Sequence, residues 1–435
     1  MRTGLTCLFI YTAIAAHAAN IEGYWEGALT NKGQQCPIQV EFLKEDGKLT
    51  GNLSMPTYRW LGNPFNEVTV DGDAVHATLG YMSAHVLDAH IQGRGKNATI
   101  KGEWSVNKLR IPFTLARAEK AELPYAIEEV TFRNGDITLA GAVYAPKTSG
   151  KHGAVVLLHG SGDNPRHWYY EPADWFARQG MVCLIFDKRG NGKSTGKWLD
   201  VGFNELADDG IAGLRLLQTR DDVDPKKIGF WGISQAGWIM EAAAQRCADT
   251  AFFVCISGGT AVVEREGYWD YECTLRAKGY SDQDVADTTE MLRRFNQVIR
   301  TGHGYDEFLE WMKPMRDKPY WSLLEWAPRP PTAIYQQWYR RVMDFDPEPI
   351  LRELNIPTLF IYGEADDSNP TAEGVAMLNK VKTETGKDMT ILAFPGADHG
   401  VRVAAAPDAA FPFRLRPQEF WDGTARWLKD KGINK

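Results

Sequence analysis

A serine flanked by small residues stands between an apolar run and a segment that can form a helix. The run over residues 227–233 leads directly into Ser234, Gln235, Ala236 and Gly237. A tight turn from a strand into a helix needs small neighbours around such a serine, because the serine backbone is strained while its hydroxyl projects above the sheet. Ala236 stands where the pattern G-x-S-x-G has its second glycine, and Gly237 follows directly. We therefore predict that Ser234 is a nucleophile on a strand-to-helix turn.

A serine hydroxyl needs a base, and the base needs a carboxylate to orient it. Two later segments can supply these groups, and each follows an apolar run. After PTLFIY come three acidic candidates, Glu364, Asp366 and Asp367, which compete for the role on position alone. After MTILAFPG comes His399, the expected imidazole. The chain order of serine, acid and histidine is the one that a nucleophile on such a turn uses.

A tetrahedral intermediate also requires backbone N–H groups aimed at its negatively charged oxygen. We expect one of them to be the N–H of Gln235, directly after the nucleophile. The other should come from the loop after VVLLHG, where we predict the N–H of Ser161. His159 in this loop is expected to brace it by hydrogen bonding rather than to act as a second base, because no carboxylate at a strand end is paired with it.

The remaining motifs predict neither a metal nor a nucleotide cofactor. Gly190–Thr195 is similar to a phosphate-binding loop, but the first glycine of G-x-x-x-x-G-K-[ST] would fall on Asp187. His76, His85 and His90 have no cysteine or paired carboxylate at ligand spacing, so we expect ordinary strand or surface histidines. The prediction is therefore no cofactor and no metal.

Six continuous apolar runs alternate with helix-length stretches from about residue 119 to the C-terminus. This pattern is typical of a mostly parallel sheet that helices cover on both faces. Ligands bind beyond the carboxyl ends of such strands, and Ser234, Asp366 and His399 each follow one of these runs. The runs are GAVVLLHG, GMVCLIFD, KIGFWGIS, AFFVCISGG, PTLFIYGEAD and MTILAFPG.

Between about residues 260 and 350 this alternation stops, and a helical insertion intervenes. Fifteen of the 90 residues over 261–350 are Phe, Trp or Tyr, a larger share than the 11% of the whole chain. Two interpretations stay open, because aromatic side chains serve both purposes. The insertion is either a lid that lines an apolar pocket or a helical subdomain that packs on itself.

The region from residue 20 to about residue 118 has the alternating pattern of short β-strands. EDGK and VDGD place Asp-Gly between alternating runs, which favours hairpins. We predict a small antiparallel barrel or sandwich here, with its tryptophans in the core. We assign this region no chemistry.

The first 19 residues contain one arginine, an apolar run from Leu5 to Ala16, and small residues spaced A-x-A at Ala16 and Ala18. The run is too short to span a bilayer, which needs about 20 apolar residues. We predict a cleaved signal peptide over residues 1–19 and a secreted or periplasmic protein. No later segment is apolar enough to predict a membrane anchor.

The composition is that of an ordinary globular protein, with 44% hydrophobic and 24% charged residues. A net charge of −7 offers no broad basic surface for phosphates, so nucleic acid is not expected as a partner. Five cysteines follow the predicted signal, and an odd, sparse set is no disulfide framework. Cys183 and Cys255 lie in apolar runs and are predicted to be buried thiols, which leaves Cys247 with Cys273 as the one candidate disulfide pair.

Five motifs in order resemble the bacterial branch of the α/β-hydrolase superfamily that contains exported serine carboxylesterases, and more distantly the prolyl-oligopeptidase-type peptidases. They are HGSG, FDKRGNGKSTG, GISQAG, YGEADDSNP and FPGADHG, and the resemblance extends from Glu119 to the C-terminus. It implies an α/β-hydrolase fold, with a mostly parallel central sheet flanked by helices, over residues 119–435. The region over residues 20–118 also resembles a separate N-terminal all-β domain that precedes some exported members of this branch. Together with the insertion, this predicts a catalytic domain with a helical cap at about 260–350.

The same resemblance implies roles for individual residues. Asp366 is the implied acid, because it lies four residues before Pro370 as in loops of the form G-x-x-D-x-x-x-P. Asp187 and Arg189 are expected to brace a loop beside the active site.

We therefore expect a serine hydrolase that cleaves carboxylic esters with short or small apolar acyl groups, through an acyl-enzyme on Ser234. A small-molecule ester is the expected partner. A serine peptidase or amidase would use the same three residues, but the N-terminal region is too short for a propeller of seven or eight blades at about 40 to 50 residues each. An inactive binding protein on the same fold is the third hypothesis. The natural substrate, the role of the N-terminal region and the oligomeric state stay open.

Overall fold

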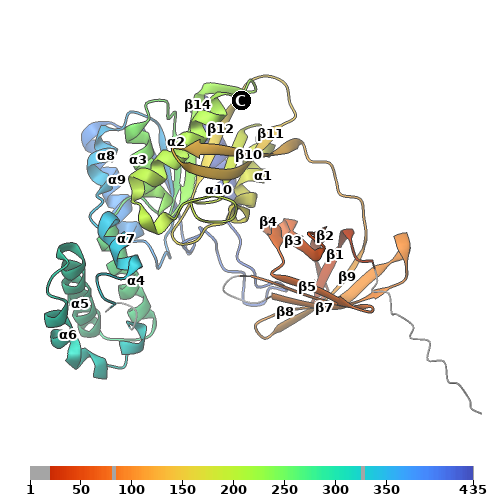
Figure 1. Cartoon of the computed structure of the whole chain (residues 1–435), viewed down its shortest axis with the longest axis horizontal. Helices are drawn as coiled ribbons and strands as arrows, with labels where there is room; N and C mark the ends of the chain where they lie inside the picture. The colour runs from red at the N-terminus through yellow and green to blue at the C-terminus, as the bar shows by residue number, and fades with distance from the viewer. Residues whose placement is uncertain (1–19, 81–84, 325–328, 435) are drawn as a thin grey trace, which may run out of the picture. The chain divides into compact units, whose positions relative to one another are not determined.

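The computed structural model describes residues 20–80, 85–324 and 329–434, and the chain divides into two compact units, Met1–Glu122 and Leu123–Lys435. The predicted signal peptide, residues 1–19, lies outside the described residues. Strands make up the first unit, whereas strands and helices alternate in the second (Figure 1). No helix in these three described ranges has the length and apolar character that crossing a membrane requires.

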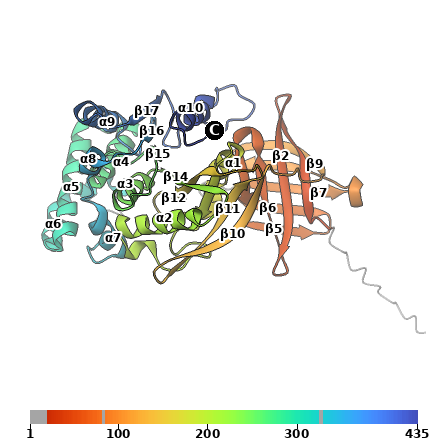
Figure 2. The ribbon, with the colours of Figure 1, turned by 90° about the horizontal axis from the view of Figure 1, so that it is seen from above.

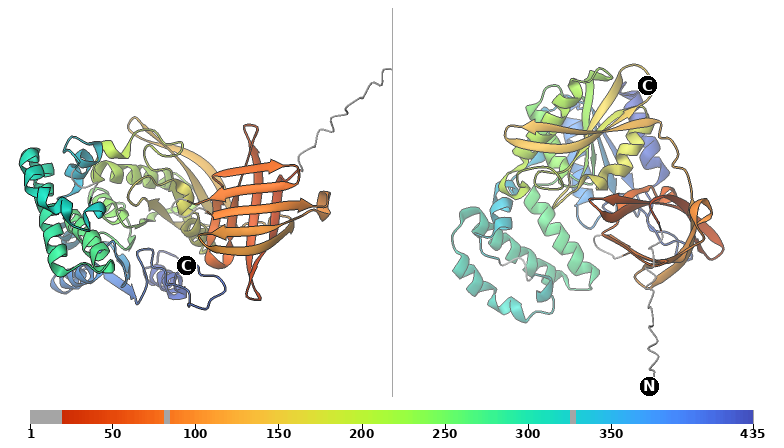
Figure 3. Two further views of the ribbon diagram at one scale, coloured as in Figure 1. Left: turned by 90° about the horizontal axis from the view of Figure 1, so that it is seen from below. Right: turned by 45° about the vertical axis from the view of Figure 1, so that its right-hand side comes forward.

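The first unit is a single antiparallel sheet of nine strands in the order β4-β3-β2-β1-β9-β8-β7-β6-β5. Its first and last strands, β1 and β9, pair near the centre, and the sheet curves strongly (Figure 3). The predicted Asp-Gly turns join β2 to β3 and β5 to β6. Trp25 and Trp104 are buried, which confirms the prediction that they fill the core. The strands are β1 Gly23–Asn31, β2 Gln34–Glu45, β3 Lys48–Met55, β4 Trp60–Pro64, β5 Glu67–Asp71, β6 Ala74–Leu79, β7 His85–Gln92, β8 Thr99–Val106 and β9 Leu109–Arg117.

The second unit is built on an eight-stranded sheet in the order β10-β11-β13-β12-β14-β15-β16-β17. The hairpin of β10 and β11 joins β13 in antiparallel orientation, and the other six strands run parallel. These six are the apolar runs of the sequence. The strands are β10 Tyr125–Asn134, β11 Ile137–Pro146, β12 His152–Leu158, β13 Val182–Phe186, β14 Val223–Ile233, β15 Phe253–Ile256, β16 Thr358–Gly363 and β17 Met389–Phe394.

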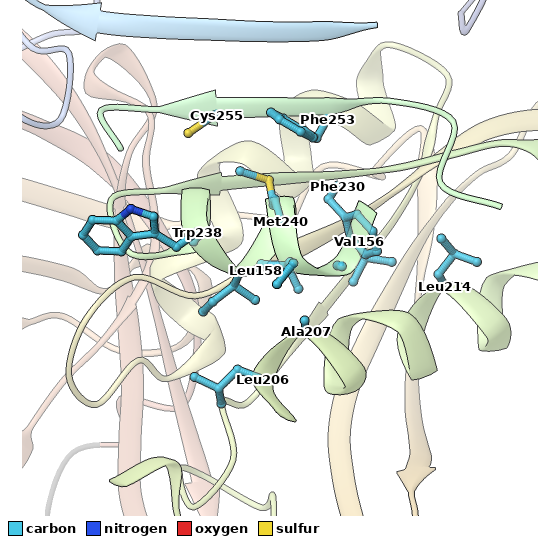
Figure 4. Close-up of a cluster of buried hydrophobic side chains, with 14 of the residues drawn as sticks. Val156, Leu158, Leu206, Ala207, Leu214, Phe230, Trp238, Met240, Phe253 and Cys255 are labelled. Carbon is cyan, nitrogen blue, oxygen red and sulfur yellow. The ribbon is translucent and has the colours of Figure 1, made fainter. Parts of the chain in front are cut away.

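Helices cover both faces of this sheet, as Figure 2 shows for α2 on one side and α10 on the other. Alternate residues of β12 enter two different cores, because successive side chains of a strand point to opposite faces. Val156 and Leu158 pack toward α2 and α3 (Figure 4), whereas Val155 and Leu157 pack toward α1 and α10. The helices are α1 Tyr170–Arg178, α2 Phe203–Gln218, α3 Ala236–Arg246, α9 Thr371–Thr385 and α10 Gln418–Asp430.

A helical insertion separates β15 from β16, and it has a hydrophobic core of its own. Tyr271, Phe295, Phe308 and Tyr320 are buried in that core, which favours the interpretation of a subdomain that packs on itself. Its longest helix begins at a Ser281 capping box and ends where Gly302 adopts a left-handed conformation, with φ of 76°. The helices are α4 Val263–Ala277, α5 Asp282–Thr301, α6 Tyr305–Met312, α7 Ile334–Val342 and α8 Pro347–Glu353.

The five described cysteines are free thiols. Cys183 and Cys255 are completely buried in β13 and β15, which confirms their prediction as buried thiols. Cys247 and Cys273, the candidate disulfide pair of the sequence, are therefore separate thiols in the structure.

Candidate active site

Ser234 lies at the turn between β14 and α3 and has a positive φ of 59°. A left-handed backbone costs a residue with a side chain about 1–3 kcal/mol, so the surrounding hydrogen bonds must hold it. The Ser234 N–H donates to Ile256 O at 2.8 Å, and Ser234 O accepts from the Gly237 N–H at 2.8 Å. The turn is thus tied both to the neighbouring strand β15 and to the first turn of α3.

Glycines around this turn allow backbones to approach where a side chain would collide. A Cβ atom on Gly237 would lie 2.5 Å from Gly259 N, and one on Gly258 would lie 2.2 Å from Ser234 O. A Cβ atom on Gly232 would lie 2.3 Å from the Cβ of Ala236. Gly237, rather than position 236, is therefore the point where α3 meets the loop after β15. This contact explains how the sequence tolerates alanine at the second small position.

The structure brings Asp366 and His399 together beyond the ends of β16 and β17. His399 Nδ1 lies 2.9 Å from Asp366 Oδ2 and 3.0 Å from Asp366 Oδ1. Asp366 Oδ1 also accepts from the N–H groups of Ser368 at 2.8 Å and Asn369 at 2.9 Å. The carboxylate is fully buried, whereas the His399 side chain is 26% exposed. Of the three acidic candidates, Asp366 is the one hydrogen-bonded to His399 in the described structure.

The pKa of His399 is raised above its ordinary value of 6.5. Burial alone would lower this pKa, but the hydrogen bond that His399 donates to Asp366 and the negative charge of Asp366, aided by those of Glu266 and Asp367, outweigh it. The imidazolium form is therefore stabilised, as a base that must accept a proton requires.

Helix α4 of the insertion contributes acidic residues near this pair that the sequence did not single out. Trp269 Nε1 donates to Asp366 O at 3.4 Å, which fixes α4 against the acidic loop. Burial raises the pKa of Glu266 to about 8, and the charge of Asp366 acts in the same direction while that of His399 opposes it. Glu266 and Asp270 are one helical turn apart, and this spacing was the signal that the sequence offered. It indicates no function unless the position of α4 next to Asp366 is known.

The loop after β12 lies next to the nucleophile. A Cβ atom on Gly160 would lie 4.0 Å from the Cβ of Ser234, so the predicted Ser161 is one residue from that contact. His159 is buried, its Nε2 lies 2.7 Å from Phe186 O, and burial lowers its pKa to about 3. It is therefore a neutral hydrogen-bonding brace, as predicted.

The loop after β13 is braced as the family resemblance implied. Arg189 donates to both oxygens of Asp209, at 2.6 and 2.8 Å, and both side chains are buried. Asp187 accepts from the N–H of Arg166 at 3.2 Å and from the N–H of Lys193 at 3.1 Å. Between them stands Lys188, a buried lysine that the sequence analysis did not recognise.

Ser234 and His399 follow strands of the same parallel sheet, but among the described residues no hydrogen bond joins the Ser234 hydroxyl to the imidazole. The N–H groups of Ser161 and Gln235 likewise have no hydrogen-bond partner within the described ranges. In the same ranges, no three side chains of His, Cys, Asp or Glu gather in a way that could hold a metal ion.

Comparison with known proteins assigns the family. A family model described as "Alpha/beta hydrolase family" matches residues 155–412, which is more than half of the chain. The chain belongs to the alpha/beta hydrolase family. The matched segment of this alpha/beta hydrolase includes Ser234, Asp366 and His399.

Curated relatives match this alpha/beta hydrolase over part of their length. It is 30% identical over 125 residues to the quorum-quenching protein AidA of Acinetobacter baumannii, and the aligned segment covers 28% of this chain and 40% of that protein. It is 24% identical over 265 residues to the esterase EstD of Thermotoga maritima, and the aligned segment covers 58% of this chain and 57% of that protein. The chain thus spans less than two thirds of each relative.

Among solved structures, the Pyrococcus furiosus esterase Pf2001 is 16% identical to this alpha/beta hydrolase, with a TM-score of 0.44. The match covers 72% of this chain and 95% of that structure.

Proposed function

We propose that this alpha/beta hydrolase cleaves carboxylic esters through an acyl-enzyme on Ser234. The Ser234 hydroxyl attacks the ester carbonyl while His399 Nε2 accepts its proton, and the protonated imidazole then gives that proton to the leaving alcohol. Asp366 holds the imidazole in orientation through Nδ1. A water molecule, deprotonated by His399, attacks the acyl-enzyme and releases the carboxylic acid and free Ser234.

The predicted oxyanion site completes this reaction. The carbonyl oxygen gains negative charge as the serine attacks, and N–H groups placed beforehand stabilise that charge more in the transition state than in the substrate. We assign this role to the N–H groups of Ser161 and Gln235, which lie on the two segments next to Ser234 and have no other partner within the described ranges.

The observation that carries the proposal is the left-handed backbone of Ser234, with φ of 59°, at the carboxyl end of β14. A strained serine persists only where its surroundings enforce it, and such strain is concentrated at reactive sites. The hydrogen-bonded pair of Asp366 and His399 beyond β16 and β17, together with the named activity of the esterase EstD, supports the same function. We propose short or small apolar acyl groups as substrates.

Covalent labelling and ester hydrolysis test this proposal. We expect the protein to react with a fluorophosphonate probe and to hydrolyse p-nitrophenyl esters, fastest at the short end of a series from two to sixteen carbons. Ser234→Ala should remove both activities and leave the circular dichroism spectrum unchanged, because the substitution deletes only the hydroxyl. Ester turnover by Ser234→Ala equal to that of the parent protein would exclude Ser234 as the nucleophile. Faster turnover of peptide anilides than of esters would favour the peptidase hypothesis.

Ser281→Ala is a matched control for the loss of a serine hydroxyl. Ser281 caps α5 and accepts from the Asp284 N–H, so its loss should cost about 1 kcal/mol of stability. We expect ester turnover to remain, because Ser281 lies in the insertion and contacts none of the proposed catalytic residues.

We also propose that the protein is exported through cleavage of residues 1–19. The intact mass of the protein purified from culture medium or periplasm should correspond to a chain that begins near Asn20. The uncleaved mass in the cytoplasmic fraction alone would contradict export.

A further inference from the structure

Lys188 follows β13, and its ammonium group is buried between the loop after β12 and the side chain of Gln235. The residue is 1% exposed, and Nζ lies 2.8 Å from Gly160 O, 3.0 Å from Gly162 O and 3.1 Å from Gln235 Oε1. The ammonium has three N–H donors, and these three oxygens accept all of them. A buried charge is costly unless it is fully hydrogen-bonded, so this geometry is highly constrained.

The first contact determines where the Ser161 N–H points. The bond between Gly160 and Ser161 is trans, as are all described peptide bonds, so the Gly160 carbonyl and the Ser161 N–H point in opposite directions. Because the carbonyl faces Lys188, the N–H of Ser161 must face away from Lys188. The neighbouring Gly160 N–H is already donated to the Tyr169 hydroxyl at 3.1 Å, so it is not available to an oxyanion.

The third contact reaches the other half of the proposed oxyanion site. Gln235 is 1% exposed, and its side-chain oxygen accepts from Lys188 while its own N–H is the second proposed oxyanion donor. One ammonium group therefore connects the loop after β12 with the residue after the nucleophile. In addition to the pairing of β12 with β14, this side chain links the two segments that carry the proposed backbone donors.

Trp198 encloses the ammonium from another side. Lys188 Nζ lies 4.6 Å from the centroid of the Trp198 ring, and Trp198 Nε1 donates to Asp163 Oδ1 at 2.8 Å. Burial lowers the pKa of Lys188 to about 7, while the charge of Asp163 opposes this change. The aromatic face and the nearby carboxylate both stabilise the cation in a site that excludes water.

We propose that Lys188 is a positioning residue that holds the N–H groups of Ser161 and Gln235 on one developing oxyanion. The inference rests on the proposed function, since it needs a reaction with such an intermediate. Loss of a lysine that only stabilised the fold would lower the unfolding temperature. It would not change how much more tightly the site binds the transition state than the substrate. The two roles therefore predict different measurements.

Lys188→Met keeps an unbranched side chain that is one atom shorter, and it removes the three N–H donors. We expect kcat for p-nitrophenyl acetate to fall on the order of 10²-fold, the range seen when an oxyanion donor is lost. The affinity for a trifluoromethyl ketone, which forms a tetrahedral adduct on the serine, should fall by a similar factor. KM should change little, because the carbonyl oxygen of the bound substrate forms weaker hydrogen bonds with the two N–H groups than the oxyanion does.

Lys193→Met is the matched control, because Lys193 is an exposed lysine of the same loop. It should leave kcat, KM and ketone affinity unchanged. Equal kcat and ketone affinity in Lys188→Met and the parent protein would overturn the inference and leave the proposed function standing. A parent protein that fails to react with a fluorophosphonate would instead overturn the proposed function and the inference together.

Gln235→Met tests the same inference if Lys188→Met does not fold. It keeps the backbone N–H of residue 235 and the lysine, and removes the side-chain amide whose oxygen joins them. A parallel fall in kcat and ketone affinity supports the inference. Unchanged values for both would overturn it, because the connection between the two segments would then have no effect on the oxyanion.

Discussion

The contact between Asp366 and His399 governs two properties of the imidazole at once. A carboxylate next to Nδ1 favours the tautomer with the proton on that nitrogen, which leaves Nε2 free to accept a proton. It also raises the pKa of His399 against the effect of burial. The neutral imidazole is the active form, so kcat/KM should rise with pH through a midpoint above 6.5.

Asp366→Asn should change both properties. An amide can donate to Nδ1 and so favour the wrong tautomer, and kcat should fall on the order of 10³- to 10⁴-fold, as for the equivalent change in serine proteases. The acid limb of kcat/KM should move to lower pH, because burial still lowers the pKa of His399 while the main opposing charge is gone. Rates measured between about pH 5 and pH 9 provide the test.

Asp367→Asn is the control for this substitution. Asp367 is exposed and acts on His399 through its charge alone, so we expect only a small shift of the acid limb to lower pH and an unchanged kcat. Similar losses of kcat in the two variants would show that His399 does not depend on Asp366 for its orientation.

At the scale of elements, the approach of α3 to the loop after β15 supports the nucleophile turn. Gly237→Ala would place a methyl group 2.5 Å from Gly259 N and 2.8 Å from Gly258 C, and backbone atoms cannot move away as a flexible side chain can. We expect a loss of stability of about 1–3 kcal/mol, because the extra methyl overfills a packed site, and a large loss of kcat, because the turn must shift. Thermal unfolding and ester turnover measure the two effects.

Ala236→Gly is the matched substitution at the neighbouring position. It restores G-x-S-x-G and removes a methyl group, so we expect a cost of no more than about 1 kcal/mol near the start of α3 and nearly unchanged kcat. If Ala236→Gly were the more damaging of the two, the close contact at Gly237 would not be what supports the turn.

Sequence reasoning identified the elements whose pattern is local. The six parallel strands appear as continuous apolar runs, and four of them, β12, β13, β15 and β16, are buried on both faces. The hairpin of β10 and β11 was missed, since β10 is an edge strand and half of its residues, among them Glu128 and Glu129, are exposed. Its charged, half-exposed sequence lacks the apolar run on which the prediction depended.

Lys188 could not be found from its sequence for a different reason. A lysine between Asp187 and Arg189 in a glycine-rich loop has the pattern of a solvated turn. Its burial results from Gly160 and Gly162, 28 and 26 residues earlier, and from Gln235, 47 residues later. Such a site exists only once the parallel sheet has brought the three segments to the same edge.

For the molecule as a whole, the division at Glu122 separates a β-sheet unit from the unit that contains every proposed catalytic residue. The second unit has two cores on the faces of its own sheet and a third in the insertion. We expect a protein of residues 123–435 to fold alone and to keep kcat/KM for p-nitrophenyl acetate within a few-fold of the full chain, because each core lies within that range. Circular dichroism and ester turnover of the truncated protein test this.

A truncated protein that folds but loses activity on this small ester would show that the first unit contributes to catalysis. Loss of activity on larger esters alone would instead assign the first unit to substrate selection.

The proposed base, His399, lies in the loop that follows β17, a strand at one edge of the sheet. Within the described residues β17 pairs with β16 alone, and its central residues are partly exposed, whereas every residue of β16 is buried. Terminal strands open locally at a lower free energy than central ones, so the amide protons of β17 should exchange sooner than those of β14. On gradual heating, the serine would therefore lose its proton acceptor before the central strands separate. Inactivation would then be reversible on cooling and would precede the calorimetric transition.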